Sequence, residues 1–565
     1  MPRSSTFARL AVLVVGLVPV ACSPEIGPGM IGDAASAELC VGVVDVPDPA
    51  LRELLLSVVE QPEPPEDATE DPEPVVLAEN LRRLRGLSAA GLGIEDLRGL
   101  ECAQGLTSLG LAGNAITDLT PLTNLTGLTQ LELSGNQITD LGSLAPLFRL
   151  ERVALDANGI EDLRPLRDLT GLRTLDIGDN VITDLGPLSG LSALTVLRIS
   201  NNMVSDLGPL SGLSELFALE ADANTIGSLS PLDGLQKLQF VDIADNDVDS
   251  LQPLASATAM RELVVNGNAL TSLQGIEAMT GVTRIEARGN AITSTEGVAN
   301  LTEIEILDLT ANEVATLPGV ENLARVRRLI LPDNRITDIS AIAGHPVLRD
   351  LDIRGNPVTD ISAVATLPLL GGFHAGAEGV MLDLAPLGGR TVLRTISYIG
   401  GDAGDLAVFG ELPALESINF SGTGLSTAQL EQIASASTLQ ALTLVECGIT
   451  DVAPLEALPL LETLDVRDNE LTSIASAAFW VNLRSLRLNR NPLASLAGLE
   501  LHELLREVDI SGSAVDDLTP LAVNETFRTG DELIAEDTAL DEGDCPAIAT
   551  IRERMGVVTT DVSCP

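Results

Sequence analysis

The stretch LELSGNQITDLGSL, from Leu131 to Leu144, recurs in altered form about every 22 residues along the 565-residue chain. Aligned on this period, the sequence forms 20 units, which have 22 residues each except for the units at Leu370 (23) and Leu415 (24). Their common form is L-x-x-L-x-L-x-x-N-x-I-x-D-L-x-P-L-x-x-L-x-x. A period held through this many copies predicts one elongated repeat domain. The units begin at Leu84, Leu106, Leu128, Leu150, Leu172, Leu194, Leu216, Leu238, Met260, Val282, Ile304, Val326, Leu348, Leu370, Leu393, Leu415, Leu439, Leu461, Leu483 and Leu505.

The first six positions of a unit predict a short strand. In the unit at Leu128, Leu131 and Leu133 are two residues apart, so in a strand both point to the same face of the sheet. A single unit cannot bury these leucines, so successive units must stack on one another. Their strands would pair in parallel about 4.8 Å apart, which gives a curved sheet on the order of 90 Å long.

Position 9 is Asn in 12 consecutive units, from Asn114 to Asn356. At this point the chain leaves the strand, and buried backbone groups lose their sheet partners. An inward Asn amide both donates and accepts, so it can satisfy these groups across adjacent coils. Cys447 occupies the same position, and we interpret it as a small structural residue with a weak donor.

Position 13 carries a recurring carboxylate in the first half of the chain, as at Asp118, Asp140, Asp162, Asp184 and Asp206. In later units the same position carries Ser228, Ser250, Ser272, Ser294 and Thr316. A metal ligand or an acid–base group would not tolerate exchange for a hydroxyl. Asp, Ser and Thr share a short oxygen that caps a helical turn, and the following L-x-P-L fits such a turn. These side chains are therefore predicted to be scaffold.

The repeated pattern resembles the leucine-rich repeats, and its D-L-x-P-L half is similar to the internalin type. The resemblance covers about Cys40 to Pro565. It implies an α/β solenoid, a horseshoe with a parallel concave β-sheet and short 3-10 or helical turns on the convex side. It further implies a non-catalytic role in binding macromolecules, mainly proteins.

The chain divides into five expected regions. Residues 1–21 form a signal peptide, 22–39 a tether, 40–83 an N-terminal cap, 84–526 the repeats and 527–565 a C-terminal cap. Val46 to Glu60 predicts a helix similar to the N-terminal cap of internalin-like proteins, and QPEPPEDATEDPEP after it is an acidic loop that cannot build a core. Asp544 to Cys564 predicts a helix and a strand, which resembles the C-terminal cap of exported bacterial repeat proteins.

The repeat is irregular at 370–414, where Glu378 and Gly401 replace the Asn of position 9. His374 and Tyr398, the only tyrosine, lie in these two units. Decay of the repeat, a change of curvature and a binding feature all remain open as explanations. The longer unit after them predicts a true helix, because Ser426 and Gln429 have the spacing of a capping box.

The N-terminal MPRSSTFARLAVLVVGLVPVACS predicts export, because arginines precede an apolar run too short to span a bilayer. Cys22 resembles the lipid-acceptor cysteine of a bacterial lipoprotein, although Pro19 stands where that pattern usually has Leu. Ordinary secretion with cleavage after Ser23 is the alternative. No later segment has 18 uninterrupted apolar residues, so membrane contact is expected only through a lipid anchor, at the cell envelope.

Five further cysteines in an exported chain favour pairing. Cys40 with Cys102 would close the start of the domain and Cys545 with Cys564 its end, which leaves Cys447 over. The chain has no Cys-x-x-Cys pair, so neither a zinc ribbon nor a thioredoxin-type site is supported.

The formal charge of −48 argues against a nucleic-acid partner, because phosphate neutralisation needs clustered Lys and Arg. The acidity fits either a solvated, self-repelling surface or a cationic partner. No catalytic or phosphate-binding motif occurs, and His345, His374 and His502 are scattered. We expect these histidines at the surface or in turns, no cofactor or metal, and a monomer.

Positions 3, 5 and 7 face the open side of the expected sheet and supply the candidate binding residues. Carboxylates stacked about 5 Å apart repel by roughly 1 kcal/mol per pair even in water, which suggests a cationic partner near Glu220, Asp222 and Asp242. A Ca²⁺-dependent adhesin and a passive envelope component are the alternatives. The candidates are Glu132, Asp156, Asp176, Glu220, Asp222, Asp242, Glu262, Glu286, Arg288, Asp308, Arg328, Asp352 and Arg354.

Overall fold

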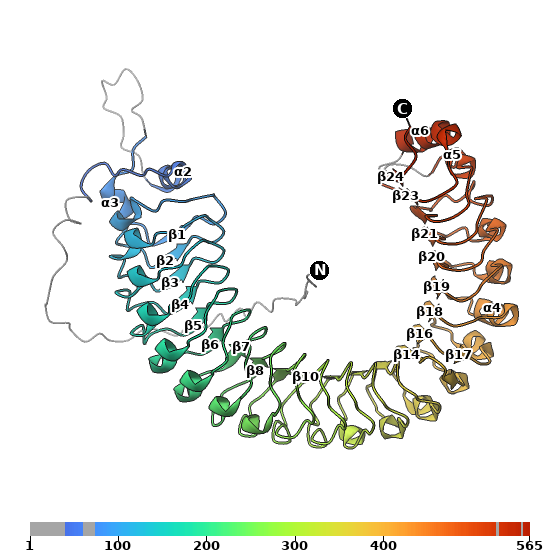
Figure 1. Cartoon of the computed structure of the whole chain (residues 1–565), viewed down its shortest axis with the longest axis horizontal. Helices are drawn as coiled ribbons and strands as arrows, with labels where there is room; N and C mark the ends of the chain where they lie inside the picture. Colours follow the sequence, from blue (N-terminus) through green and yellow to red (C-terminus); the bar gives the residue numbers. More distant parts are fainter. Residues whose placement is uncertain (1–39, 60–73, 527–529, 555–556, 565) are drawn as a thin grey trace.

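A computed structural model describes residues 40–59, 74–526, 530–554 and 557–564. The predicted signal peptide, Cys22, the tether and most of the acidic loop lie outside these residues. Within the described residues the chain winds into an open horseshoe whose inner side is one parallel sheet of 22 strands (Figure 1). Helical turns occupy the outer side. The predicted α/β solenoid is therefore confirmed.

The strands of the large sheet follow one another in chain order. They are β1 (Gly86–Ser88), β2 (Ser108–Gly110), β3 (Gln130–Glu132), β4 (Arg152–Ala154), β5 (Thr174–Asp176), β6 (Val196–Arg198), β7 (Ala218–Glu220), β8 (Phe240–Asp242), β9 (Glu262–Val264), β10 (Arg284–Glu286), β11 (Ile306–Asp308), β12 (Arg328–Ile330), β13 (Asp350–Asp352), β14 (Gly372–Ala375), β16 (Thr395–Ile399), β18 (Ser417–Ser421), β19 (Ala441–Val445), β20 (Thr463–Asp465), β21 (Ser485–Arg487), β22 (Glu507–Asp509), β23 (Glu532–Ala535) and β24 (Val557–Thr560). A separate parallel pair joins β15 (Met381–Leu382) to β17 (Asp402–Ala403).

The outer side carries mostly short 3-10 helices. They are η1 (Leu100–Cys102), η2 (Thr120–Leu122), η3 (Gly142–Leu144), η4 (Arg164–Leu166), η5 (Gly186–Gly190), η6 (Gly208–Gly212), η7 (Ser230–Leu232), η8 (Gln252–Leu254), η9 (Val320–Asn322), η10 (Ser340–Ile342), η11 (Ser362–Thr366), η12 (Ala385–Leu387), η13 (Ala407–Glu411), η14 (Ala453–Ala457), η15 (Ala475–Phe479) and η16 (Glu542–Asp544). The α-helices are α2 (Pro49–Val58), α3 (Ala78–Leu81), α4 (Thr427–Ala434), α5 (Thr519–Val523) and α6 (Cys545–Arg554). No helix among the described residues combines the length and apolar character needed to cross a bilayer.

The core is a stack of aliphatic layers, one per coil. Leu109 pairs with Leu131 and Leu131 with Val153, so the same position of each coil lies directly over its neighbour. These side chains are buried in every coil. Each buried aliphatic side chain contributes about 1.5–3 kcal/mol, and only stacking excludes water from it.

Side-chain amides of position 9 tie adjacent coils together, as predicted. The Asn246 Oδ1 accepts a hydrogen bond from the Ile226 N–H of the preceding coil at 2.9 Å. Its Nδ2 donates to the carbonyl oxygens of Ala221 in the preceding coil and of Ile243 in its own coil, at 3.0 and 3.1 Å. Cys447 follows the same plan: its thiol lies 3.1 Å from the Phe420 carbonyl oxygen, and Asn469 accepts from its N–H.

The position-13 oxygens cap the outer turns, also as predicted. Asp140 Oδ1 accepts from the N–H of Gly142, the first residue of η3, at 2.8 Å. Ser250 does the same for Gln252 at the start of η8, at 3.3 Å. A hydroxyl therefore replaces the carboxylate without loss of the turn. The predicted capping box of Ser426 and Gln429 likewise opens α4.

A second row of polar donors lies on the outer side, and the sequence did not predict it. Position 20 is usually Leu, but it is His345 in the unit at Val326, and Trp480, His502 and Asn524 in the last three units. In each case a side-chain nitrogen lies 2.8–3.1 Å from a backbone carbonyl oxygen of the preceding coil. Two of the three histidines therefore lie in the outer turns, one of the two places expected for them, and they are buried there.

Tyr398 replaces the missing Asn of the irregular units. Its hydroxyl points inward and lies 2.9 Å from the carbonyl oxygen of Asp402 and 3.1 Å from that of Val380. A Cβ on Gly401 would overlap this hydroxyl, so glycine at position 9 makes room for it. Burial raises the pKa of Tyr398 to about 12, which keeps the hydroxyl a proton donor. The solenoid thus continues through 370–414 by a different hydrogen bond.

Both ends of the stack are covered. At the N-terminal end, Leu51 and Leu55 of α2 are fully buried, and a disulfide joins Cys40 to Cys102. Asp48 caps α2 with one oxygen and accepts from Glu95 N–H in the first repeat with the other. At the C-terminal end, α6 and β24 close the sheet, and a disulfide joins Cys545 to Cys564.

Two substitutions separate the roles of positions 9 and 13. Asn246→Ala leaves buried backbone groups without partners, so it should destabilise the protein by about 1–3 kcal/mol and clearly lower the melting temperature. Asp140→Ser keeps a capping oxygen and should leave the melting temperature almost unchanged. Comparable losses in the two variants, measured by calorimetry, would show that these assignments are wrong.

Candidate functional site: the concave surface

The strands line the inner side of the horseshoe (Figure 1), and the side chains at their positions 3, 5 and 7 form its concave surface. They point outward because the residues at positions 4 and 6 between them point into the core. In β5, for example, Leu175 is fully buried while Thr174 and Asp176 are partly exposed. All 13 candidate binding residues lie on this surface, on the coils of β3 to β13.

The first part of the concave surface is acidic. Arg198 lies between two carboxylates: it donates to Glu220 at 2.9 Å and lies 3.8 Å from Asp176. All three side chains remain partly exposed, so these ion pairs add at most about 1 kcal/mol. The side chains of Glu132 and Glu262 make no ion pair or hydrogen bond within the described residues. This part of the concave surface therefore keeps an excess of negative charge, and we call it the acidic arc. Its carboxylates are Glu132, Asp156, Asp176, Glu220, Asp222, Asp242 and Glu262.

Two carboxyl groups of the acidic arc hold their protons unusually well. Burial, followed by the charge of Asp156, raises the pKa of Asp176 to about 6. Burial, opposed by the Ala244 N–H but assisted by Asp222 and Glu220, raises the pKa of Asp242 to about 7. Repulsion among these neighbours agrees with the expected unfavourable stacking of carboxylates.

The central part of the concave surface is neutralised within the protein. Glu286 and Asp308 are almost fully buried, with 1% and 2% of their surface exposed. Arg288 contacts both, at 3.3 Å and 2.7 Å, and Arg284 also pairs with Glu286. Carboxylates locked in this way are not free to bind a cation.

Further along the sheet the charges pair within or between adjacent coils. Arg328 contacts Asp350 at 3.3 Å. Arg354 makes two hydrogen bonds to Asp352, at 2.9 and 2.5 Å. The candidate residues thus extend over many coils and do not converge on one point. This spread fits a broad interface better than a small active site.

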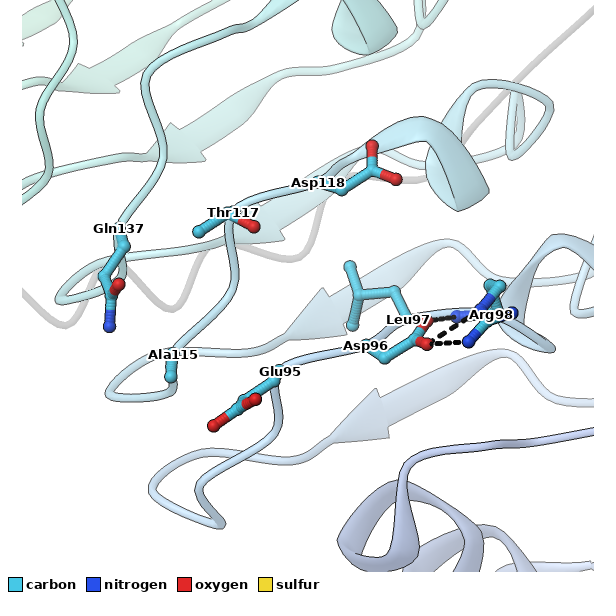
Figure 2. A pocket seen from close by; sticks show the side chains of 8 residues that line it. All are labelled: Glu95, Asp96, Leu97, Arg98, Ala115, Thr117, Asp118 and Gln137. Carbon is cyan, nitrogen blue, oxygen red and sulfur yellow. Dashed lines mark hydrogen bonds and ion pairs between the residues drawn. The ribbon is translucent and has the colours of Figure 1, made fainter.

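Two hollows interrupt the surface near the N-terminal end. One, of about 230 Å³, lies on the concave surface over β2 to β6, where Gly110 and Ala154 leave space beside Glu132 and Asp176. The other, of about 500 Å³, lies on the flank of the first coils (Figure 2). Among the side chains drawn in Figure 2, only Asp96 and Arg98 are joined by hydrogen bonds or an ion pair.

Sequence reasoning missed an uncharged part of the concave surface, which we call the neutral band. Its side chains come from positions 3 and 5 of β14, β16, β18 and β19. Because most of these side chains are small and uncharged, residue type alone did not mark them as candidate binding residues. The neutral band consists of Gly372, His374, Thr395, Ser397, Ser417, Asn419, Ala441 and Thr443.

The reactive side chains of the chain are engaged in structure. His345 and His502 contact backbone carbonyl groups, and His374 lies 3.2 Å from Asp350. Burial raises the pKa of the Cys447 thiol to about 11, which makes it a poor nucleophile. The described ranges contain no group of three or more His, Cys, Asp or Glu side chains arranged to hold a metal ion.

The raised pKa of Asp242 makes a prediction for stability. The folded protein holds this proton up to about pH 7, whereas the unfolded chain loses it near pH 3.8, so ionisation destabilises the fold increasingly from about pH 4 to pH 7. Asp242→Asn keeps an acceptor for the Ala244 N–H and removes the charge. Its melting temperature should exceed that of the wild type at pH 8 and match it at pH 4. Equal differences at both pH values would contradict the assignment.

Sequence comparison identifies the repeat directly. Residues 104–146 match the family described as Leucine Rich repeats (2 copies), and residues 170–186 match the family described as Leucine Rich repeat. No curated protein matches the chain in sequence.

Structural comparison extends the match over most of the solenoid. An internalin of Listeria monocytogenes (inlF) is 30% identical, covers 58% of this chain and 95% of its own, and has a TM-score of 0.54. The plant peptide hormone receptor RGFR1 in complex with RGF2 is 16% identical, covers 82% of this chain and 80% of its own, and has a TM-score of 0.57. The TDR receptor is 18% identical, covers 81% of this chain and 91% of its own, and also has a TM-score of 0.57. The two receptors share the fold alone. The internalin match and the repeat together show that the chain belongs to the bacterial leucine-rich repeat proteins of the internalin type.

Proposed function

We propose that the chain is a non-catalytic scaffold that binds a partner protein through its concave surface at the bacterial cell envelope. One observation carries the proposal: the inward positions stay the same from coil to coil while the outward positions change. Leu175, Leu197 and Leu219 stack in adjacent strands, whereas their neighbours at position 5 are Asp176, Arg198 and Glu220. A fixed frame with variable outward side chains suits recognition of a macromolecule.

The rigidity of the frame supports tight recognition. Most coils are tied to the preceding one by the side-chain amide of position 9, as by the buried Asn246. A surface that is ordered before binding loses little conformational entropy on association. Its area extends over many coils, which suits a protein partner better than a small molecule.

The charges of the surface favour a partner with a basic region. The acidic arc carries Glu220, Asp222 and Asp242 with one nearby cation, Arg198. A Ca²⁺-dependent adhesin is less favoured, because Glu286 and Asp308 are already paired with arginine. The net charge of −48 also disfavours nucleic acid.

Charge reversal tests this proposal. Glu220→Lys with Asp222→Lys removes two negative charges from the acidic arc and adds two positive ones, so it should abolish capture of a partner from an envelope or whole-cell extract. Asp247→Lys with Asp249→Lys makes the same charge change on the flank of an adjacent coil, where both residues are exposed. This control should bind like the wild type, and both variants should melt like it.

If the Glu220→Lys, Asp222→Lys variant still captures the partner, or if the control variant loses capture equally, the acidic arc is not part of the interface. If the wild type captures no protein from either extract, the chain is a passive envelope component.

We further propose that Cys22 carries a lipid that anchors the chain to the membrane, with secretion as the alternative. Cys22→Ser removes the acceptor thiol and should move the protein from the membrane fraction to the soluble exported fraction. Continued membrane association of the variant after fractionation would rule out the lipid anchor.

A further inference from the structure

The neutral band differs from the rest of the concave surface in charge and in hydrogen bonding. Ion pairs close it on both sides: Asp352 with Arg354 on the coil of β13, and Asp465 with Arg467 on the coil of β20. Because these charges satisfy one another, the band between them presents no unbalanced charge in a chain of net charge −48.

The band holds a buried hydroxyl without a partner. Ser397 points to the concave side, since Ile396 and Tyr398 on either side of it point into the core. Only 6% of its surface is exposed, and its Oγ makes no hydrogen bond in the described part of the chain. A buried hydroxyl in this state destabilises the fold unless something outside the chain bonds to it.

Two other members of the same row, Asn419 and Thr443, also have polar groups without a partner among the described residues. His374 and Asn419 lie in register with it on the adjacent strands. The Asn419 Oδ1 accepts from Ser421, which leaves the amide N–H groups without a partner among the described residues. Thr443, in register with Asn419, has no side-chain hydrogen bond there either. Donors and acceptors therefore recur about every 4.8 Å along the band.

Small and apolar side chains flank this polar row. At position 3, Gly372, Thr395, Ser417 and Ala441 are small, which lets another chain approach closely. At position 7, half-buried Ile399 and Val445 lie on either side of Ser421. The band thus combines a hydrogen-bonding row with two apolar side chains beside it, as an extended polypeptide combines its main chain with apolar side chains.

We propose that the neutral band binds an uncharged, extended segment of the partner protein, whose main-chain groups pair with Ser397 and Asn419 and whose apolar side chains cover Ile399 and Val445. This inference rests on the proposed function and assigns one part of the interface to one kind of segment. The row from β14 to β19 spans about 14 Å, the length of about four extended residues.

A neutral polysaccharide fits the band less well. Sugar rings stack their apolar faces on exposed aromatic rings, and the aromatic side chains of the band's strands point into the core. Phe373, Tyr398 and Phe420 are all fully buried. A charged segment fits less well too, because it would lose its hydration without gaining a counter-charge.

Selection from a phage-displayed library of random 12-residue peptides on the full chain tests the proposal. The enriched peptides should be poor in charged residues. Ser397→Ala and Asn419→Ala should each weaken binding of the corresponding synthetic peptides by about 2- to 10-fold, the effect of one hydrogen bond. The Ser397 variant should melt no lower than the wild type, since this buried hydroxyl has no partner among the described residues. Thr174→Ala removes a concave-surface hydroxyl on β5 and should leave binding unchanged.

Three results would overturn the inference. The first is that no uncharged peptide is enriched, or that Ser397→Ala and Asn419→Ala leave affinity intact. The second is enrichment of basic peptides whose binding is lost in the Glu220→Lys, Asp222→Lys variant, which would leave the proposed function standing. The third is Ser397-dependent binding of soluble dextran, which would assign the band to a glycan. Failure of the proposed function is separate: the wild type would then capture no protein from extracts, whatever the peptides do.

Discussion

The hydrogen bonds of the position-9 side chain are the interaction on which the rest of the structure depends. Where each strand ends, an amide such as that of Asn246 accepts from the preceding coil and donates to both coils. Without it, buried backbone groups would lose their partners at every turn. Where Asn is absent, Cys447 supplies a thiol and Tyr398 reaches the same turn with its hydroxyl. Inward donors of three chemical kinds thus serve this turn, whereas Thr423 and Ser513 occupy position 9 with buried hydroxyls that have no hydrogen-bond partner among the described residues.

Because the inward residues hold the coils together, the outward residues of the concave surface are free to vary. Leucine layers and inward donors hold the coils in register, so outward residues can change without affecting the fold. The surface is accordingly divided into an acidic arc, a centre neutralised by Arg288, and a neutral band around Ser397. Each part offers a different chemistry to a partner. In the proposed function, charge in the acidic arc would accelerate encounter, whereas buried hydrogen-bonding groups such as the Ser397 hydroxyl would determine which segment fits.

The periodic features were predictable from the sequence, and the exceptions to the period were not. Asn246 and Asp140 repeat at fixed positions, so stacking alone assigns their roles. Tyr398 stands at position 6, three residues before Gly401 at position 9. Only the fold shows that the Tyr398 hydroxyl occupies the space left by the absent Asn side chain. The pairing of Arg288 with Asp308 also depends on side-chain reach across adjacent coils. The neutral band was not predicted, because residue type does not reveal whether a hydroxyl such as that of Ser397 is buried without a hydrogen-bond partner.

Small-angle X-ray scattering of the full chain tests most directly whether the inward donors carry one continuous coil through all the units, including those at 370–414. A continuous solenoid predicts an elongated arc, with a radius of gyration well above the roughly 24 Å of a compact globule of this length. A radius of gyration near that of the globule would contradict the continuous coil and the concave surface built on it.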